Sequence, residues 1–213
     1  NVFRNNKSTD SGAGIGVYTQ DAGSIVQATL TNNMIYGNDS GGDGGGVYAF
    51  AHNSGRSSMT LINNSVSDNS AAGLGGGLRA YASNRGVTGI AVKNTIIWGN
   101  IAGGGQDIAI GQLSGGTATV DSSYNNVGDV TLDANAPGTY NNLGNNINTD
   151  PLFVNLTGGD LHLAVGSPAI DAGDSTNAPI VDFEGDTRPQ AAAFDMGADE
   201  RVGRRTRPVA RGR

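Results

Sequence analysis

Asn33-Met-Ile-Tyr-Gly-Asn38 is one copy of a short motif that occurs four times in this chain. The other copies are Asn1-Val-Phe-Arg-Asn-Asn6, Asn64-Ser-Val-Ser-Asp-Asn69 and Thr95-Ile-Ile-Trp-Gly-Asn100. The closing asparagines of the four copies are 32, 31 and 31 residues apart. A fixed period between about 20 and 50 residues indicates stacked structural repeats, and this period therefore governs the prediction of the fold.

Aligning the repeats reveals three columns of apolar residues. One column lies three positions before the closing asparagine, a second lies eight positions before it, and a third follows the glycines. Each repeat therefore offers three short alternating segments, each followed by a corner rich in Gly or Asn. The columns consist of Phe3, Ile35, Val66 and Ile97, of Leu30, Leu61 and Val92, and of Val17, Val47, Leu78 and Ile108.

Three strands of about five residues, with three corners, account for roughly 31 residues. This is the length of one coil of a parallel β-helix, in which each coil lies about 4.8 Å above the last. Helical repeats are excluded because stretches such as Gly41-Gly-Asp-Gly-Gly-Gly46 cannot be helical. The sequence therefore predicts an all-β parallel β-helix solenoid with about 31 residues per coil and an irregular C-terminal cap.

The regular register weakens after Asn100, and the composition changes again beyond Asp150. We expect β-helix coils over residues 1–149, about four regular and one or two irregular, then a capping module over 150–200 and a basic tail over 201–213. The module should cover the end of the last coil, where strand edges and an apolar cross-section would otherwise be exposed. Its candidate covering residues are Leu152, Phe153, Leu161, Leu163, Ile170, Ile180 and Phe183.

The asparagine column predicts a structural ladder. Asparagine tolerates the left-handed backbone of a sharp corner, and stacked side-chain amides can hydrogen-bond from coil to coil. We therefore interpret Asn6, Asn38, Asn69 and Asn100 as ladder residues and not as ligands.

The charge is divided unevenly along the chain, whose overall net charge is −6. All 19 acids lie at or before Glu200 together with seven Lys or Arg, so this body carries −12, whereas the basic tail holds six Arg and no acid. An acidic body repels nucleic acid and anionic membranes, so no nucleic-acid partner is expected, although the tail would attract either. No stretch approaches the roughly 20 apolar residues of a transmembrane helix.

The repeat, Asn-x-(Ile/Val)-x-x-Asn followed by Gly-Gly-Gly-(Val/Leu), resembles the right-handed parallel β-helix of the pectin-lyase-like superfamily, in particular the repeats of polymorphic outer-membrane proteins. The last third resembles the end of a choice-of-anchor Q domain, except that Asp199 stands where that pattern has an aromatic residue. The resemblance covers residues 1–200 and implies a bacterial protein that is secreted or on the cell surface. The motifs of the last third are Asp150-Pro-Leu-Phe-Val154, Gly159-Asp-Leu-His-Leu163, Gly166-Ser-Pro-Ala-Ile-Asp-Ala-Gly-Asp174, Asp182-Phe-Glu-Gly-Asp-Thr-Arg-Pro189 and Asp195-Met-Gly-Ala-Asp-Glu200.

One outward-facing strip is a candidate binding surface. If Val17, Val47 and Leu78 point inward, alternation directs their neighbours outward. A strip of exposed aromatic rings can stack on sugars or form a protein interface, whereas loops folded over the strip would make it structural. The strip consists of Tyr18, Tyr48, Phe50, Arg79 and Tyr81.

The last third is dense in acids, which could supply the six to eight oxygen ligands of Ca²⁺. Their spacing matches no EF-hand loop, and acidic turn residues are commonly just solvated. No other cofactor is expected, because His52 and His162 are too far apart for a zinc site by spacing. Arg188 lies among several acids, which predicts a structural salt bridge. The candidate Ca²⁺ ligands are Asp171, Asp174, Asp182, Asp186 and Asp195.

No catalytic residue is predicted, because no column of Arg or Lys accompanies Asp43 and Asp107, the two acids that precede glycine-rich strands. We expect a non-catalytic structural or adhesive β-helix that belongs to a larger chain or assembly. Since Asn1 lies inside a repeat, upstream sequence, a protein partner or a second copy should cover the first coil. The alternatives are a polysaccharide lyase or glycoside hydrolase, and a glycan-binding module without turnover.

Overall fold

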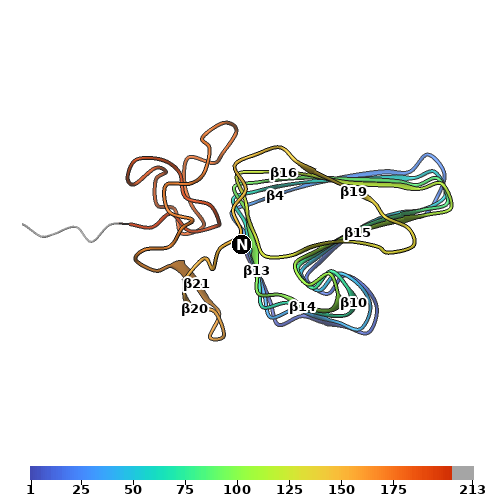
Figure 1. The fold of residues 1–213 in the computed structure, drawn as a ribbon, viewed down its shortest axis with the longest axis horizontal. Helices are drawn as coiled ribbons and strands as arrows, with labels where there is room; N and C mark the ends of the chain where they lie inside the picture. The colour runs from blue at the N-terminus through green and yellow to red at the C-terminus, as the bar shows by residue number, and fades with distance from the viewer. Residues whose placement is uncertain (203–213) are drawn as a thin grey trace, which may run out of the picture.

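The computed structural model describes residues 1–202 and shows a parallel β-solenoid of about four turns that repeat roughly every 31 residues. Figure 1 looks along the stack, so that successive coils overlie one another. The described residues contain no helix, and hence no helix that is long and apolar enough to cross a membrane. The predicted fold class is confirmed. The basic tail falls almost entirely outside the described residues.

The coils stack into four parallel sheets, which we call sheets A to D. The first four coils contribute one strand to each sheet, and a last, incomplete coil adds a strand to sheets A, C and D. Sheet A contains the repeated motif, and its central column, Ile35, Val66 and Ile97, is fully buried as predicted. Its strands are β1 (Val2–Arg4), β5 (Met34–Tyr36), β9 (Ser65–Ser67), β13 (Ile96–Trp98) and β17 (Asn126–Val127).

Sheet B was not predicted, because the sequence analysis expected three strands per coil and sheet B is formed by a fourth. It follows the asparagine corner, and its strands are so short and so rich in Ser, Ala and Gly that no apolar periodicity marks them. Its strands are β2 (Lys7–Ser8), β6 (Asp39–Ser40), β10 (Ser70–Leu74) and β14 (Ile101–Gly104).

Sheet C follows the glycines, and its register corrects the third predicted column. Val47 pairs with Ile15, and Val17 pairs with Ala49 instead. Because the shift is two residues, Val17 still points inward. The strands of sheet C are β3 (Ile15–Thr19), β7 (Val47–Ala51), β11 (Leu78–Ser83), β15 (Ile108–Leu113) and β18 (Val130–Leu132).

Sheet D closes each coil and has the longest strands. The predicted column is confirmed, since Leu30 pairs with Leu61 and Leu61 with Val92. These side chains join those of sheets A and C in one core that runs through the stack. The strands of sheet D are β4 (Ile25–Thr31), β8 (Arg56–Ile62), β12 (Val87–Lys93), β16 (Thr117–Ser123) and β19 (Thr139–Asn142).

The asparagine column forms an unbroken ladder at the corner between sheets A and B. Each side-chain Nδ2 donates to the Oδ1 of the next coil, at 2.8 Å from Asn6 to Asn38, 2.8 Å from Asn38 to Asn69 and 2.9 Å from Asn69 to Asn100. The left-handed residue of the corner is the one before each ladder asparagine, not the asparagine itself. These left-handed residues are Asn5, Gly37, Asp68 and Gly99.

A carboxylate takes over where the ladder ends. Asn100 has no asparagine above it, and its Nδ2 donates at 2.8 Å to Oδ1 of the buried Asp107.

A second ladder at the corner between sheets D and A was not predicted. In it, Asn1 donates to Asn33 at 3.1 Å and Asn33 to Asn64 at 2.9 Å.

The C-terminal module, residues 150–200, corrects the predicted placement, because it lies along the side of the stack and not over its end (Figure 1). It begins with an antiparallel hairpin of β20 (Phe153–Asn155) and β21 (Asp160–Leu163) and is otherwise irregular. The module lies there because it covers Met34 and Ile96 on the outer face of sheet A, which would otherwise expose apolar surface.

Two apolar clusters and several hydrogen bonds hold the module in place. Leu163 and Met196 pack on Ile96, and Leu161 packs on Met34. Among the bonds, Asn63 Nδ2 donates to Asp195 O at 3.1 Å. Of the predicted covering residues, Leu161 and Leu163 are buried, Phe153, Ile170 and Phe183 are half-buried, and Leu152 and Ile180 are 42% and 77% exposed.

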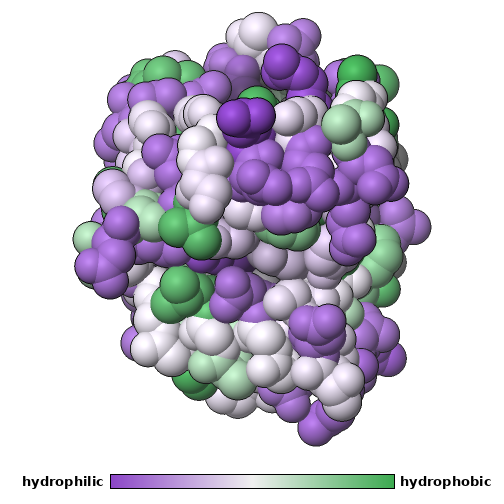
Figure 2. Space-filling view, turned by 90° about the vertical axis from the view of Figure 1, so that its right-hand side faces the viewer, coloured by the Kyte–Doolittle hydropathy of each residue, from purple (hydrophilic) through white to green (hydrophobic). Residues whose placement is uncertain are grey.

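Among the described residues, the opposite side of the solenoid carries no large apolar area. Figure 2 shows that side, with hydrophilic residues spread across it and hydrophobic residues in small, separate spots. The face matches an ordinary solvated surface, since a docking face usually gathers its apolar residues into one patch.

Candidate functional site

The predicted aromatic strip exists on the outer face of sheet C, but much of it is covered. The register sets Tyr18 beside Phe50 and Phe50 beside Tyr81, while Tyr48 lies beside Arg79. Tyr48 is 6% exposed and Arg79 is 2% exposed, because the glycine-rich corners fold back over them. Burial raises the pKa of the Tyr48 hydroxyl, which therefore stays protonated.

The rings stack on one another. Phe50 lies nearly parallel to Tyr48 and to Tyr81, with ring centroids 6.1 Å and 5.8 Å apart, and Tyr18 meets Tyr48 edge to face. The Arg79 guanidinium lies 4.9 Å from the centroid of the Tyr81 ring. Rings in such stacks turn their faces toward one another, and a sugar that stacks on a ring needs a free face. The arrangement favours a stabilising role for the strip.

Arg79 on β11 links two other segments of the solenoid, those of Asp133 and Asp43, through its guanidinium group. Its Nη1 and Nη2 each donate to Asp133 at 2.7 Å, and its Nε lies 3.4 Å from Asp43 Oδ2. Burial opposes the charge, but the bonds to Asp133 and the negative charges of both carboxylates outweigh it and raise the pKa of Arg79. This fork-to-fork pair is structural, since both nitrogens of the fork are occupied.

Arg79→Met should lower the free energy of unfolding by about 2 kcal/mol, because it leaves Asp133 and Asp43 without their shared cation. The cost stays moderate since both carboxylates reach solvent, with 15% and 29% of their side chains exposed. Urea denaturation measures the change, and Arg56→Met, at an exposed position on β8, is the control. Equal effects of the two substitutions would contradict the assignment.

The five predicted Ca²⁺ ligands are not gathered into one site. Asp182 and Asp186 lie together with Glu184, with candidate ligand atoms within 4.8 Å of one another. Asp182 Oδ1, however, already accepts three backbone N–H groups, each at 2.9 Å. Asp174 pairs with Lys93.

Asp171 and Asp195 share a separate network. Asp195 Oδ1 accepts the N–H of Asp171 at 2.7 Å, and Asp171 Oδ1 accepts that of Ala193 at 2.8 Å. These carboxylates hold turns of the module in place. Ca²⁺ binding stays a prediction, now confined to Asp182 and Asp186.

The predicted salt bridge of Arg188 is confirmed, and its partner is the buried Glu200. Its Nη1 donates to Glu200 Oε2 at 2.9 Å, and Nη2 donates to the backbone oxygens of Gly197 and Ala198 at 3.0 and 2.9 Å. Burial lowers the pKa of Arg188, although the nearby Glu200 carboxylate opposes the shift. The pair fixes the end of the module.

Asp195 gives the module a specific pH dependence, because burial raises the pKa of its carboxyl to about 7. An unfolded aspartate has a pKa of about 3.9, so between roughly pH 4 and 7 the folded protein holds a proton that the unfolded chain lacks. This group's contribution to stability therefore falls as pH rises through that window.

Asp195→Asn should remove that pH dependence. We expect the Tm of the variant, relative to the unmodified protein, to rise from pH 5 to pH 8. Thermal denaturation at four pH values in constant salt measures the difference, and a difference that does not change with pH would contradict the prediction.

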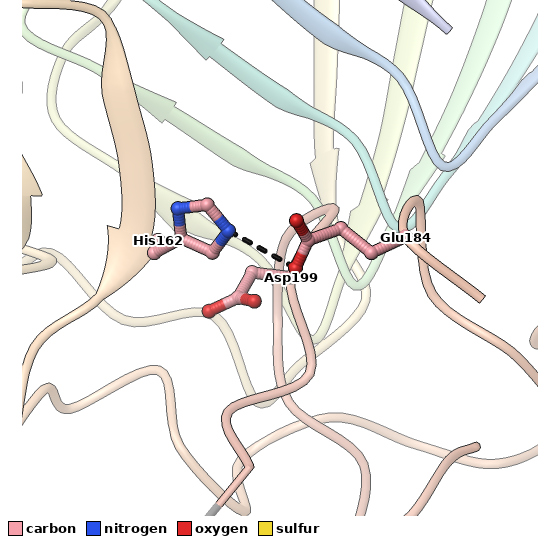
Figure 3. A group of neighbouring side chains, drawn as sticks. All are labelled: His162, Glu184 and Asp199. Atoms are coloured by element: carbon pink, nitrogen blue, oxygen red, sulfur yellow. Dashed lines mark hydrogen bonds and ion pairs between the residues drawn. The ribbon is translucent and has the colours of Figure 1, made fainter. Parts of the chain in front are cut away.

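A further cluster joins three parts of the module (Figure 3). His162 comes from β21, Glu184 from the turn after Asp182, and Asp199 from the last described segment. His162 Nε2 lies 3.2 Å from Glu184 Oε2, and its Nδ1 lies 2.5 Å from Asp160 Oδ1. The three side chains of the figure line a hollow of about 350 Å³.

Charge and burial act together in this cluster. Partial burial disfavours a charged His162, but the bonds to Asp160 and Glu184 outweigh this effect and raise its pKa. Burial raises the pKa of Asp199. Sequence spacing could not reveal the cluster, because its members lie 22 and 15 residues apart in an irregular region.

Comparison with protein-family models, curated proteins and solved structures gives no match to this chain. The functional argument therefore rests on the residues and their geometry.

Proposed function

We propose that this chain is a non-catalytic structural or adhesive β-solenoid of a bacterial surface or extracellular protein. The proposed location, and the kinship with pectin-lyase-like proteins, polymorphic outer-membrane proteins and choice-of-anchor domains, rest on the sequence resemblance. Its physical role would be to hold a stiff, extended face toward a partner.

The proposal rests on the bonds that Asp43 and Asp107 make within the solenoid. These are the two acids that precede glycine-rich strands. Asp107 accepts bonds from Asn100 and from the N–H of Asp129. Asp43 accepts the N–H of Leu74 at 2.8 Å and pairs with Arg79. A general acid or base must be free to exchange a proton with substrate. Both carboxylates are instead occupied by hydrogen bonds, and Asp43 also by an ion pair, within the solenoid.

A specific observation favours a polysaccharide as the partner, which is the glycan-binding alternative. A hollow of about 630 Å³ lies over sheet B and is lined by small residues of three successive coils. The polar side chains of Lys7, Asp39 and Ser70 lie in register there on successive coils. Their spacing of about 4.8 Å suits an extended polymer. Lys7 and Asp39, 3.3 Å apart, stand at its rim.

Retention of the protein on immobilised acidic and neutral polysaccharides tests the proposal. We expect retention without release of unsaturated or reducing ends, and its loss in Ala72→Trp, which fills the hollow. Ala22→Trp is the matched control, because Ala22 is an exposed alanine on the turn between sheets C and D. Release of sugar ends over time would support the lyase or hydrolase alternative and contradict the proposal.

A further inference from the structure

His162, Glu184 and Asp199 converge from three separate segments of the C-terminal module, far from the hollow over sheet B. Their candidate ligand atoms all lie within 4.8 Å of one another. Figure 3 shows the imidazole and the two carboxylates grouped around a common space. Glu200 of the Arg188 ion pair also borders this space, but His162, Glu184 and Asp199 take no part in that pair.

The histidine is already oriented for one of its two nitrogens to act as a ligand. Asp160 Oδ1 lies 2.5 Å from His162 Nδ1, which makes Nδ1–H the donor of that bond. Nε2 then faces Glu184 and the hollow. A carboxylate that holds the far nitrogen of a metal-bound histidine is the usual support of such a ligand.

Asp199 supplies a second fixed group. Its side chain is 5% exposed, and its Oδ2 accepts the N–H of Leu163 at 2.8 Å. Among the described residues, its Oδ1 accepts no hydrogen bond, although the residue lines the hollow. Asp199 Oδ1 therefore offers the hollow an acceptor that no donor among the described residues occupies.

The separation of the His162 and Glu184 ligand atoms fits a small cation. Metal distances of about 2.0–2.2 Å to nitrogen and oxygen in a tetrahedron place neighbouring ligand atoms about 3.4 Å apart. His162 Nε2 and Glu184 Oε2 are 3.2 Å apart. The nitrogen ligand favours the zinc class over Ca²⁺, which takes six to eight oxygens.

We propose that His162, Glu184 and Asp199 bind a divalent cation of the zinc class. Asp160 orients His162, and a water molecule in the hollow completes the coordination. The carboxylates of Asp160, Glu184 and Asp199 supply the compensating negative charge, which Arg201 at the edge of the hollow reduces only in part. The competing explanation is a protonated His162 that pairs with the same carboxylates and needs no metal.

Calorimetric titration of the whole chain with Zn²⁺, after removal of metal by a chelator, tests the proposal. We expect one Zn²⁺ per chain, about a 100-fold weaker affinity in His162→Gln, and about a tenfold loss in Asp160→Asn, the range seen when such supporting groups are removed. His52→Gln is the control, because His52 directly follows β7, outside the cluster, with its Nδ1 2.8 Å from Ser83 Oγ.

A second measurement does not depend on the stability of the variants. Addition of Zn²⁺ should shift the ¹⁵N resonance of His162 Nε2 and leave His52 unchanged. Binding that survives His162→Gln, binding lost equally in His52→Gln, or Ca²⁺ bound as tightly as Zn²⁺ would each overturn the proposal. A His162 signal that titrates with pH and ignores Zn²⁺ would establish the competing explanation.

Discussion

Asn69→Ala should lower the free energy of unfolding by about 3–5 kcal/mol, because it orphans several buried polar groups at once. The Asn69 amide donates to Asn100 Oδ1 and to the backbone oxygen of Ile35, each at 2.9 Å, and its Oδ1 accepts from Asn38. Asn69 is buried, so bulk solvent does not reach these groups. For a chain of this size, the loss corresponds to a Tm about 10 °C lower, measured by differential scanning calorimetry.

Asn6→Ala is the matched control at the exposed end of the same ladder. Its side chain makes one bond, to Asn38 Oδ1, and solvent can replace it. We expect a loss below about 1 kcal/mol. Similar losses at the two positions would show that the ladder contributes little beyond the backbone pairing of the coils.

Arg188→Met should destabilise the C-terminal module by about 3–5 kcal/mol, because it leaves the Glu200 carboxylate buried without its cation. Three backbone oxygens also lose one of their two donors. Amide hydrogen exchange can localise the effect. We expect faster exchange at Met196 and Gly197, whose N–H groups bond to Ala169 O and Asn94 O, while the strands of sheet D stay protected.

Two further variants separate the buried charge from the packing. Arg188→Met combined with Glu200→Leu should recover part of the loss, since no unpaired charge remains. Lys93→Met removes a more exposed pair with Asp174 and should cost no more than about 1 kcal/mol. A double variant as unstable as the single one would contradict the electrostatic explanation.

The solenoid could be predicted because its information is local and repeated. Ile35, Val66 and Ile97 recur at the coil period, and each occupies the same inward position. The register of the first coil was wrong by two residues because Ile15 and Val17 both alternate inward, so apolar pattern alone cannot choose between them. Sheet B escaped prediction because strands such as Asp39–Ser40 carry no apolar signal.

The module could not be placed from its sequence. Its apolar residues indicated that it covers another apolar surface of the protein. The contact of Leu163 and Met196 with Ile96 could not be predicted, because the sequence does not show which face of sheet A points outward and would be left uncovered. The same holds for the cluster of His162, Glu184 and Asp199. Such contacts arise when irregular segments dock on a surface, and no period relates their members.

The lateral position of the module also bears on how the chain folds. A stack of coils is nearly one-dimensional and can fray from either end, because each coil contacts only its neighbours. The module touches β5, β9 and β13 together, through bonds such as Ala198 N to Ser65 Oγ, which join residues 133 positions apart. Three coils must therefore have formed before it can dock, and once docked it couples them so that they open as one cooperative unit.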